Sequence, residues 1–235
     1  MKLRGALFGC GMISEFHLRA WNRIPEVEIV ALGNRTIEKA ERRRAQFAPG
    51  ARIYDELAAM LEREELDFLD ILTAPALHYA HCLLGRQAGV HIVCQKPLCS
   101  RLQDARALVR QMSDYPRVFA VHENHRYRPW FQGVRRLLRE GFFGHAYFLR
   151  LEQFDAQEPP EAYKSSAAEG VLLEYGSHLV DMIRSAFGEP RRVYARTHRG
   201  NPRVCGESLV HVVYEYPDAT AILDTGWKAG AIAQG

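Results

Sequence analysis

The stretch Gly9-Cys10-Gly11-Met12-Ile13-Ser14 directly follows the apolar run Leu3–Phe8 and opens the amphipathic run Ile13–Ile24. This succession predicts a strand, a glycine turn and a helix. Gly9 permits a tight turn, and Gly11 lets the backbone approach a pyrophosphate at the helix N-terminus. The spacing G-x-G-x-x-S departs from the dinucleotide fingerprint only at the third glycine, which is a serine here. An ordinary glycine turn is the alternative interpretation.

The same alternation continues through the first half of the chain. Further strands are expected at 27–32, 68–72, 90–94 and 118–121, and further helices at 37–47, 77–88 and 102–112, with Ser100 as a possible N-cap. Parallel strands need crossover helices, so this order predicts a doubly wound parallel sheet of the Rossmann type. Residues 1–122 are therefore expected to form a dinucleotide-binding domain.

The pattern changes after about residue 125. Helices are expected at 130–140 and 171–187, and long strands at 146–154, 192–197, 208–216 and 220–227. Tyr216-Pro217-Asp218-Ala219 reads as a turn between neighbouring strands. The predicted fold class is thus α/β, with a second α+β domain of mostly antiparallel sheet over residues 123–235, which would serve substrate binding and oligomerisation.

Composition limits the classes of function. The 235 residues are 47% hydrophobic and 25% charged, and the net charge of +3 is too small to indicate nucleic-acid binding. Arg42-Arg43-Arg44 is expected on a solvated helix face. No apolar run reaches the roughly 18 residues of a membrane span and no signal core is evident, so a cytoplasmic protein is expected. The 5 cysteines lack a C-x-x-C pair and are expected to be free thiols.

The end of the second predicted strand bears on the choice of dinucleotide. An acidic residue there would bind a ribose 2′-hydroxyl and repel a 2′-phosphate. The chain instead reads Gly33-Asn34-Arg35-Thr36. A neutral Asn34 with the Arg35 guanidinium and the Thr36 hydroxyl favours NADP over NAD. The alternative is that Asn34 only ends the strand and Thr36 caps the next helix.

Several stretches in fixed order carry a resemblance to a known family. They are Ala6–Gly11, Thr73-Ala74-Pro75-Ala76-Leu77-His78, Ala88–Val93, Val93-Cys94-Gln95-Lys96-Pro97-Leu98, Glu123–Pro129 and Glu174-Tyr175-Gly176-Ser177-His178-Leu179-Val180-Asp181. Together they resemble the glycine turn and the T-P-x-x-H, A-G-x-H-V, E-K-P, N-x-R-F-x-P and D-x-G-x-H-x-x-D motifs of the Gfo/Idh/MocA oxidoreductases. The resemblance covers essentially the whole chain.

The resemblance implies a role for the lysine of the E-K-P motif. Lys96 would lie beside the nicotinamide and hydrogen-bond the reacting oxygen, and its bond to Pro97 would be cis. Gln95 departs from the family's glutamate, although its amide can keep hydrogen bonds. A solvated lysine at a strand end is the alternative. The expected dinucleotide-binding residues are Gly9, Gly11, Met12, Ile13, Asn34, Arg35, Thr36, Thr73, Pro75, His78, Gln95 and Lys96.

Proton transfer is expected from the second domain. Glu174 and His178 share a helix face at i, i+4, and an imidazole suits the removal of a hydroxyl proton. His178 is the predicted acid/base, with Glu174 orienting it or contacting substrate. Arg126 and Tyr127 are predicted to bind substrate beside Lys96, Glu174 and His178. The alternatives are an exposed Glu174–His178 pair and a solvated Asp181. No metal centre is expected, because the histidine pairs have no nearby carboxylates or cysteines that would complete a zinc site.

The resulting expectation is an NAD(P)-dependent oxidoreductase that transfers a hydride between the cofactor, preferably NADP, and a sugar- or polyol-like hydroxyl or carbonyl. The alternative is a nucleotide-binding protein without turnover. No nucleic-acid or membrane partner is expected. The resemblance also implies a homodimer or tetramer formed through the C-terminal sheet, and a chain that looks shortened at its C-terminus.

Overall fold

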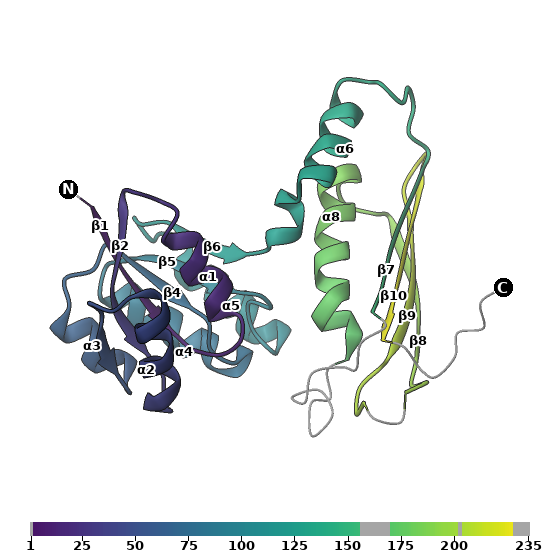
Figure 1. The fold of residues 1–235 in the computed structure, drawn as a ribbon. Helices are drawn as coiled ribbons and strands as arrows, with labels where there is room; N and C mark the ends of the chain where they lie inside the picture. The colour runs from purple at the N-terminus through teal and green to yellow at the C-terminus, as the bar shows by residue number, and fades with distance from the viewer. Residues whose placement is uncertain (1, 156–169, 202–203, 228–235) are drawn as a thin grey trace. The chain divides into compact units, whose positions relative to one another are not determined.

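The computed structural model describes residues 2–155, 170–201 and 204–227 (Figure 1). Its internal contacts divide the chain into two compact units, Met1–His122 and Glu123–Gly235. Within the described residues, all helices are too short or too polar to cross a membrane.

The first unit is built on a parallel sheet. Its 6 strands run in the order β3-β2-β1-β4-β5-β6, which confirms the predicted Rossmann-type sheet. The strands are β1 (Leu3–Phe8), β2 (Val27–Gly33), β3 (Arg52–Tyr54), β4 (Phe68–Ile71), β5 (His91–Gln95) and β6 (Phe119–His122). The helices are α1 (Ser14–Trp21), α2 (Ile37–Phe47), α3 (Leu57–Arg63), α4 (Pro75–Gln87) and α5 (Leu102–Met112).

Two elements of the first unit were not expected from the sequence. The strand β3 has only 3 residues, too few for a period to be read, and α3 has 7. The strand forms because Ala31 to Gly33 of β2 offer it a parallel register. The N-cap of α5 is Arg101, which makes no side-chain cap, so Ser100 is not the cap that was expected.

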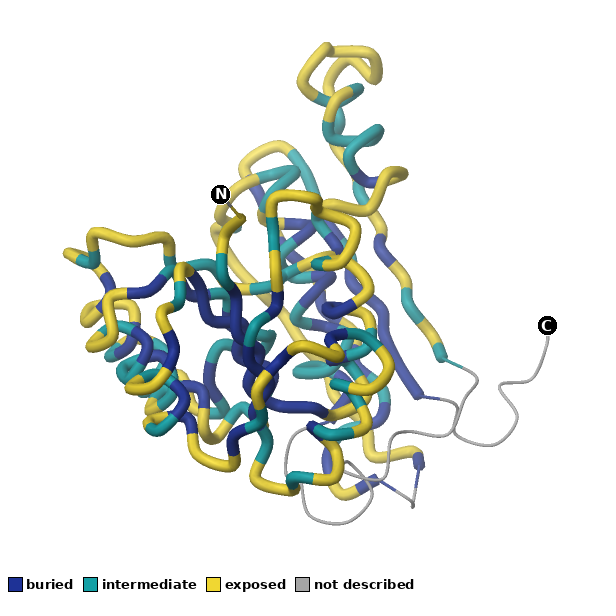
Figure 2. Tube along the Cα trace, turned by 60° about the vertical axis from the view of Figure 1, so that its left-hand side comes forward, coloured by how far each residue is buried: buried dark blue, intermediate teal, exposed yellow. Residues whose placement is uncertain are grey.

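Buried clusters cover both faces of this sheet. Side chains alternate along β1, so Ala6 and Phe8 join one cluster with α3, α4 and α5, whereas Leu7 joins the other with α1 and α2. Figure 2 shows buried, dark blue stretches in the interior and exposed, yellow stretches on the outside. No disulfide joins the cysteines among the described residues, as expected. Cys205 is the only exposed cysteine in this part of the chain.

The second unit carries a separate 4-stranded sheet in the order β7-β10-β9-β8. Its elements are the 3₁₀ helix η1 (Asn124–Tyr127), α6 (Pro129–Arg139), β7 (Phe148–Asp155), the π-helix η2 (Leu172–Gly176), α8 (Ser177–Phe187), β8 (Arg192–His198), β9 (Leu209–Glu215) and β10 (Thr220–Trp227). The pairs β10/β9 and β8/β9 are antiparallel and β10/β7 is parallel, so the sheet is mostly antiparallel, as predicted. Tyr216 N–H donates to the Ala219 carbonyl in the expected turn.

The helix expected over 171–187 is present, but it begins with a π turn. Residues 172–176 form η2, and α8 continues from Ser177 without a break. A π turn inserts an extra residue into a helix and is frequent at functional sites. The turn contains Glu174 and leads directly into His178.

Candidate active site

The glycine turn lies at the switch point of the parallel sheet, between β1 and β4. Gly9 has a φ of 113°, and a Cβ built on it would lie 2.5 Å from the Leu72 carbonyl carbon, so only glycine fits. A Cβ on Gly11 would meet nothing within 4 Å. The turn is therefore packed against the sheet at Gly9 and open at Gly11, where the α1 N-terminus with Met12 and Ile13 offers an anion site.

Asn34 ties the end of β2 to this turn. Its Oδ1 accepts from Cys10 N at 2.9 Å, and its Nδ2 donates to the Thr36 carbonyl at 2.9 Å. Thr36 is the N-cap of α2 but makes no side-chain cap, and Arg35 is exposed at the tip. Burial raises the pKa of the Cys10 thiol to about 12, so the thiol in the turn stays protonated at neutral pH.

Arg43 is a contact of the glycine turn that the sequence did not reveal. Its guanidinium donates to the Gly11 carbonyl at 3.3 Å and to Ser14 Oγ at 3.1 Å, and it pairs with Glu15. The interpretation of Arg42-Arg43-Arg44 as a solvated face is therefore wrong for Arg43, whose side chain is only 14% exposed. Ser14 Oγ in turn donates to Gly11 O, so the serine that replaces the third glycine closes the turn.

The loops after β4 and β5 form the other side of this edge. The Lys96–Pro97 bond is cis, as the resemblance implied. His78 is fully buried and its ring nitrogens contact the Pro97 and Thr73 carbonyls, each at 2.9 Å. His78 thus joins the two loops through their backbones, and this geometry does not favour its expected contact with a dinucleotide. Pro75 begins α4 in its first turn.

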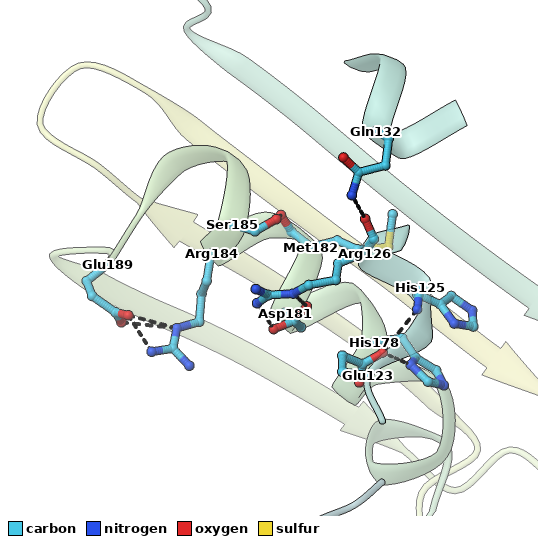
Figure 3. A network of polar contacts seen from close by, with 10 residues as sticks. All are labelled: Glu123, His125, Arg126, Gln132, His178, Asp181, Met182, Arg184, Ser185 and Glu189. Atoms are coloured by element: carbon cyan, nitrogen blue, oxygen red, sulfur yellow. Dashed lines mark hydrogen bonds and ion pairs between the residues drawn. The ribbon is translucent and has the colours of Figure 1, made fainter. Parts of the chain in front are cut away.

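His178 in the second unit is paired with a carboxylate other than the expected one. Its Nδ1 lies within hydrogen-bond distance of Glu123 Oε1, and His178 is buried (Figure 3). Glu123 follows β6 and lies 55 residues away in sequence. If Glu123 accepts the Nδ1 proton, Nε2 of the neutral ring becomes the basic nitrogen. The orienting role expected of Glu174 stays a prediction.

Arg126 is held by Asp181, also shown in Figure 3. Its Nε donates to Asp181 Oδ2 at 2.7 Å and its Nη2 pairs with Oδ1. Hydrogen bonding to Asp181 raises the pKa of Arg126. Asp181 is therefore not a merely solvated carboxylate, because it fixes the guanidinium predicted to bind substrate. Tyr127 beside it is 72% exposed.

Glu123, His125 and His178 offer ligand atoms within 4.8 Å of one another, a group that could hold a metal ion. The His125 and His178 rings are stacked, with centroids 3.7 Å apart and planes 13° apart. A metal ion lies in the plane of each imidazole that binds it. Nearly parallel stacked rings therefore do not direct their lone pairs at one ion, and the arrangement favours a carboxylate–imidazole pair over a metal centre.

The structure brings the predicted residues together in two groups. Within the first unit, the glycine turn, Asn34, Thr73 and the Lys96 turn lie along one edge of the sheet. Within the second unit, His178 and Arg126 lie in neighbouring ion pairs on α8 and η1. Glu123 and Arg43 are the additions. Glu123 stands at the start of the Glu123–Pro129 stretch, whereas nothing in the sequence distinguishes Arg43 from the arginines on either side of it.

A parallel sheet of this order with a glycine turn at its switch point defines a dinucleotide-binding fold. Residues 3–123 match the family model described as "Oxidoreductase family, NAD-binding Rossmann fold", and residues 131–232 match the "GFO/IDH/MocA C-terminal domain". The chain belongs to the Gfo/Idh/MocA oxidoreductase family, as the resemblance indicated.

Individual relatives agree with this assignment. The chain is 35% identical over 97% of its length to D-apiose dehydrogenase of Paraburkholderia graminis, covering 61% of that protein. It is 29% identical over 96% of its length to D-apiose dehydrogenase of Rhizobium rhizogenes, covering 66%. A crystal structure of an oxidoreductase from Agrobacterium radiobacter in complex with NAD+, L-tartaric acid and magnesium superposes with a TM-score of 0.92 at 28% identity, over 99% of this chain and 69% of that one. The chain thus spans less than two thirds of the length of either apiose dehydrogenase.

The two glycines of the turn make a matched pair of variants. Gly9→Ala should destabilise the fold by about 1–3 kcal/mol or more, because it combines a positive φ with a backbone clash. Gly11→Ala should leave the melting temperature unchanged but weaken dinucleotide binding at least about tenfold, the factor that corresponds to about 1.4 kcal/mol. Thermal unfolding and NADPH fluorescence titration measure the two effects. Equal dinucleotide affinity in Gly11→Ala and wild type would remove the turn from the binding site.

Proposed function

We propose that the chain is the catalytic part of an NAD(P)-dependent oxidoreductase that acts on a sugar- or polyol-like hydroxyl or its carbonyl. The observation that carries the proposal is the Lys96–Pro97 turn, which follows β5 on the same sheet edge as the open glycine turn. Ligands of open α/β sheets bind at this carboxyl edge. A bound nicotinamide dinucleotide would supply the hydride acceptor or donor.

The proposed residues divide the work. The glycine turn with Met12 and Ile13 binds the pyrophosphate, while Thr73, Pro75 and Gln95 shape the nicotinamide end. Lys96 hydrogen-bonds the reacting oxygen and stabilises negative charge that develops on it. His178 takes the hydroxyl proton at Nε2, because Glu123 holds the other ring nitrogen. In the reverse direction the same imidazole returns the proton.

We propose NADP as the preferred dinucleotide. The end of β2 carries no carboxylate at Asn34 to repel a 2′-phosphate, and the exposed Arg35 guanidinium would pair with one. The Asn34 contacts with Cys10 and Thr36 support the alternative, in which Asn34 ends the strand and does not select the dinucleotide.

The proposed substrate is a small polyhydroxylated molecule. The relatives named for apiose act on a sugar, and the substrate-facing residues proposed here suit hydroxyl groups: Arg126 held rigid by Asp181, the exposed Tyr127, and Glu174. Tyr175 is not a candidate base. Burial raises its pKa to about 12, and its hydroxyl donates to Asp155 at 2.7 Å.

We also propose a homo-oligomer formed through the second sheet. One face of this sheet packs on α8 through Leu151, Val210 and Leu223. On the other face Phe148 and Tyr194 are 52% and 63% exposed. Phe154 and Val213, which pairs with Tyr194, are exposed on the same face. An exposed apolar patch on a sheet favours association with another protein surface.

Lys96→Ala tests the proposed function. The variant should bind the dinucleotide as wild type does, while kcat falls at least about 100-fold, the scale for loss of one preorganised donor. Steady-state rates with NADP+ and a panel of sugars and polyols measure this. The exposed Lys2→Ala is the matched control and should keep full activity. Turnover that is equal in Lys96→Ala and wild type would exclude Lys96 from the mechanism.

A pair of carboxylate variants tests which group orients His178. Glu123→Gln should lower kcat about 10- to 100-fold, a part of the roughly 100- to 10,000-fold that general acid–base catalysis contributes, because the Nδ1 partner loses its charge. Glu174→Gln should affect KM more than kcat, because the residue is proposed to contact substrate hydroxyls. A larger kcat loss in Glu174→Gln than in Glu123→Gln would reverse the two roles.

A further inference from the structure

A chain of side-chain hydrogen bonds runs through the first unit to the Lys96 turn. Asp70 Oδ2 and His17 Nδ1 are 2.8 Å apart, and His17 Nε2 and Gln95 Nε2 are 3.2 Å apart. Gln95 Oε1 then accepts from Lys96 N at 2.8 Å. Asp70 is completely buried and His17 is nearly so. The chain joins β4, α1 and the end of β5.

The proton positions in this chain are fixed from its Lys96 end. The Lys96 backbone N–H can only donate, so the Gln95 atom that faces it is the amide oxygen. The Gln95 NH₂ group must then face His17, and His17 Nε2 must accept from it. A ring with an accepting Nε2 carries its proton on Nδ1, where it donates to Asp70. Every link is satisfied by a neutral His17.

Asp70 is an unusual residue to find at the centre of a parallel sheet. Its Oδ2 also accepts from Trp21 Nε1 at 2.7 Å, whereas its Oδ1 has no hydrogen-bond partner among the described residues. Burying a carboxylate with an unsatisfied oxygen costs stability and calls for an explanation in function. An apolar residue would fill this position at a lower cost in stability, so the function of the carboxylate lies in the hydrogen-bond chain that starts at Asp70.

We propose that Asp70 and His17 are positioning residues for Lys96. They hold the Gln95 amide in the one orientation that accepts the Lys96 backbone N–H, and so fix the direction in which the lysine leaves β5. The proposal rests on the proposed function of Lys96. His17 also belongs to the helix that begins at the glycine turn, so one side chain connects the pyrophosphate end of the site with the lysine.

The hydrogen-bond chain explains why a glutamine can stand where the family motif E-K-P has a glutamate. A glutamate side chain at position 95 could only accept, so His17 would have to donate from Nε2 to that carboxylate and from Nδ1 to Asp70 at once. That requires the imidazolium ion. The titratable groups placed against the ring are Asp70 from β4 and His122 from β6, whose ring centroid lies 4.3 Å from that of His17. Gln95 therefore matches a neutral His17, and a glutamate would match a charged one.

Imidazole ¹⁵N NMR of the whole protein at neutral pH tests the hydrogen-bond chain without any substrate. The His17 signals, assigned by their loss in His17→Gln, should show the Nδ1–H tautomer in wild type. In Gln95→Glu both His17 nitrogens should be protonated. A wild-type His17 that is protonated on Nε2, or a neutral His17 in Gln95→Glu, would overturn the proposed arrangement.

Kinetics of two His17 variants test the effect on Lys96. His17→Leu leaves the Gln95 NH₂ without an acceptor, and kcat should fall by up to about 100-fold, the scale of a small misplacement of a catalytic group. NADPH affinity and melting temperature are measured beside it. His17→Gln offers an amide oxygen near the Nε2 position and should restore most of the lost kcat while leaving NADPH affinity unchanged.

Failure of the proposed function and failure of the proposed role of His17 would give different results. If kcat, NADPH affinity and melting temperature fall together in His17→Leu and glutamine restores none of them, the role of His17 is structural and the inference is overturned. If wild type turns over no sugar or polyol, the proposed function fails, and the tautomer result alone then decides whether the hydrogen-bond chain exists.

Discussion

The close approach of Gly9 to the end of β4 is the constraint on which the rest of the first unit depends. A Cβ at this position would lie 2.5 Å from the Leu72 carbonyl carbon and 2.7 Å from Thr73 N, at a φ that other residues rarely adopt. Because a glycine stands there, β1 and the loop after β4 meet at the switch point. This contact brings the glycine turn and the Thr73 loop to one edge, and α1 begins from it.

Polar contacts then connect that edge to the chemistry proposed for it. His78 joins the Thr73 loop to the Lys96–Pro97 turn, and His17 joins α1 to Gln95. Arg43 reaches the glycine turn from α2. In the second unit ion pairs have the same effect. Glu123 pairs with His178, and Asp181 pairs with Arg126. The side chains proposed for proton transfer and for substrate binding are thus each held by a carboxylate.

Much of this could be predicted from the sequence, and the remainder has physical causes. The periodic runs from Leu3 to Met112 predicted the parallel sheet, because hydrophobic alternation is a local signal. The strand β3 could not be predicted because 3 residues are too few to show a hydrophobic period. The Glu123–His178 pair joins residues 55 positions apart, and no local pattern encodes such a contact. Arg43 was misread because a triple arginine is usually solvated, and only the packing of α2 shows which of the three turns inward.

The most direct measurement of the central claim is a titration of the purified chain with NADPH and, separately, NADH, following nicotinamide fluorescence. A dinucleotide site at the switch point predicts saturable binding with one nucleotide per chain, and the residues at the end of β2 predict that NADPH binds more tightly than NADH. Tighter binding of NADH would contradict the proposed preference alone. Binding of neither dinucleotide would contradict the account of the site itself.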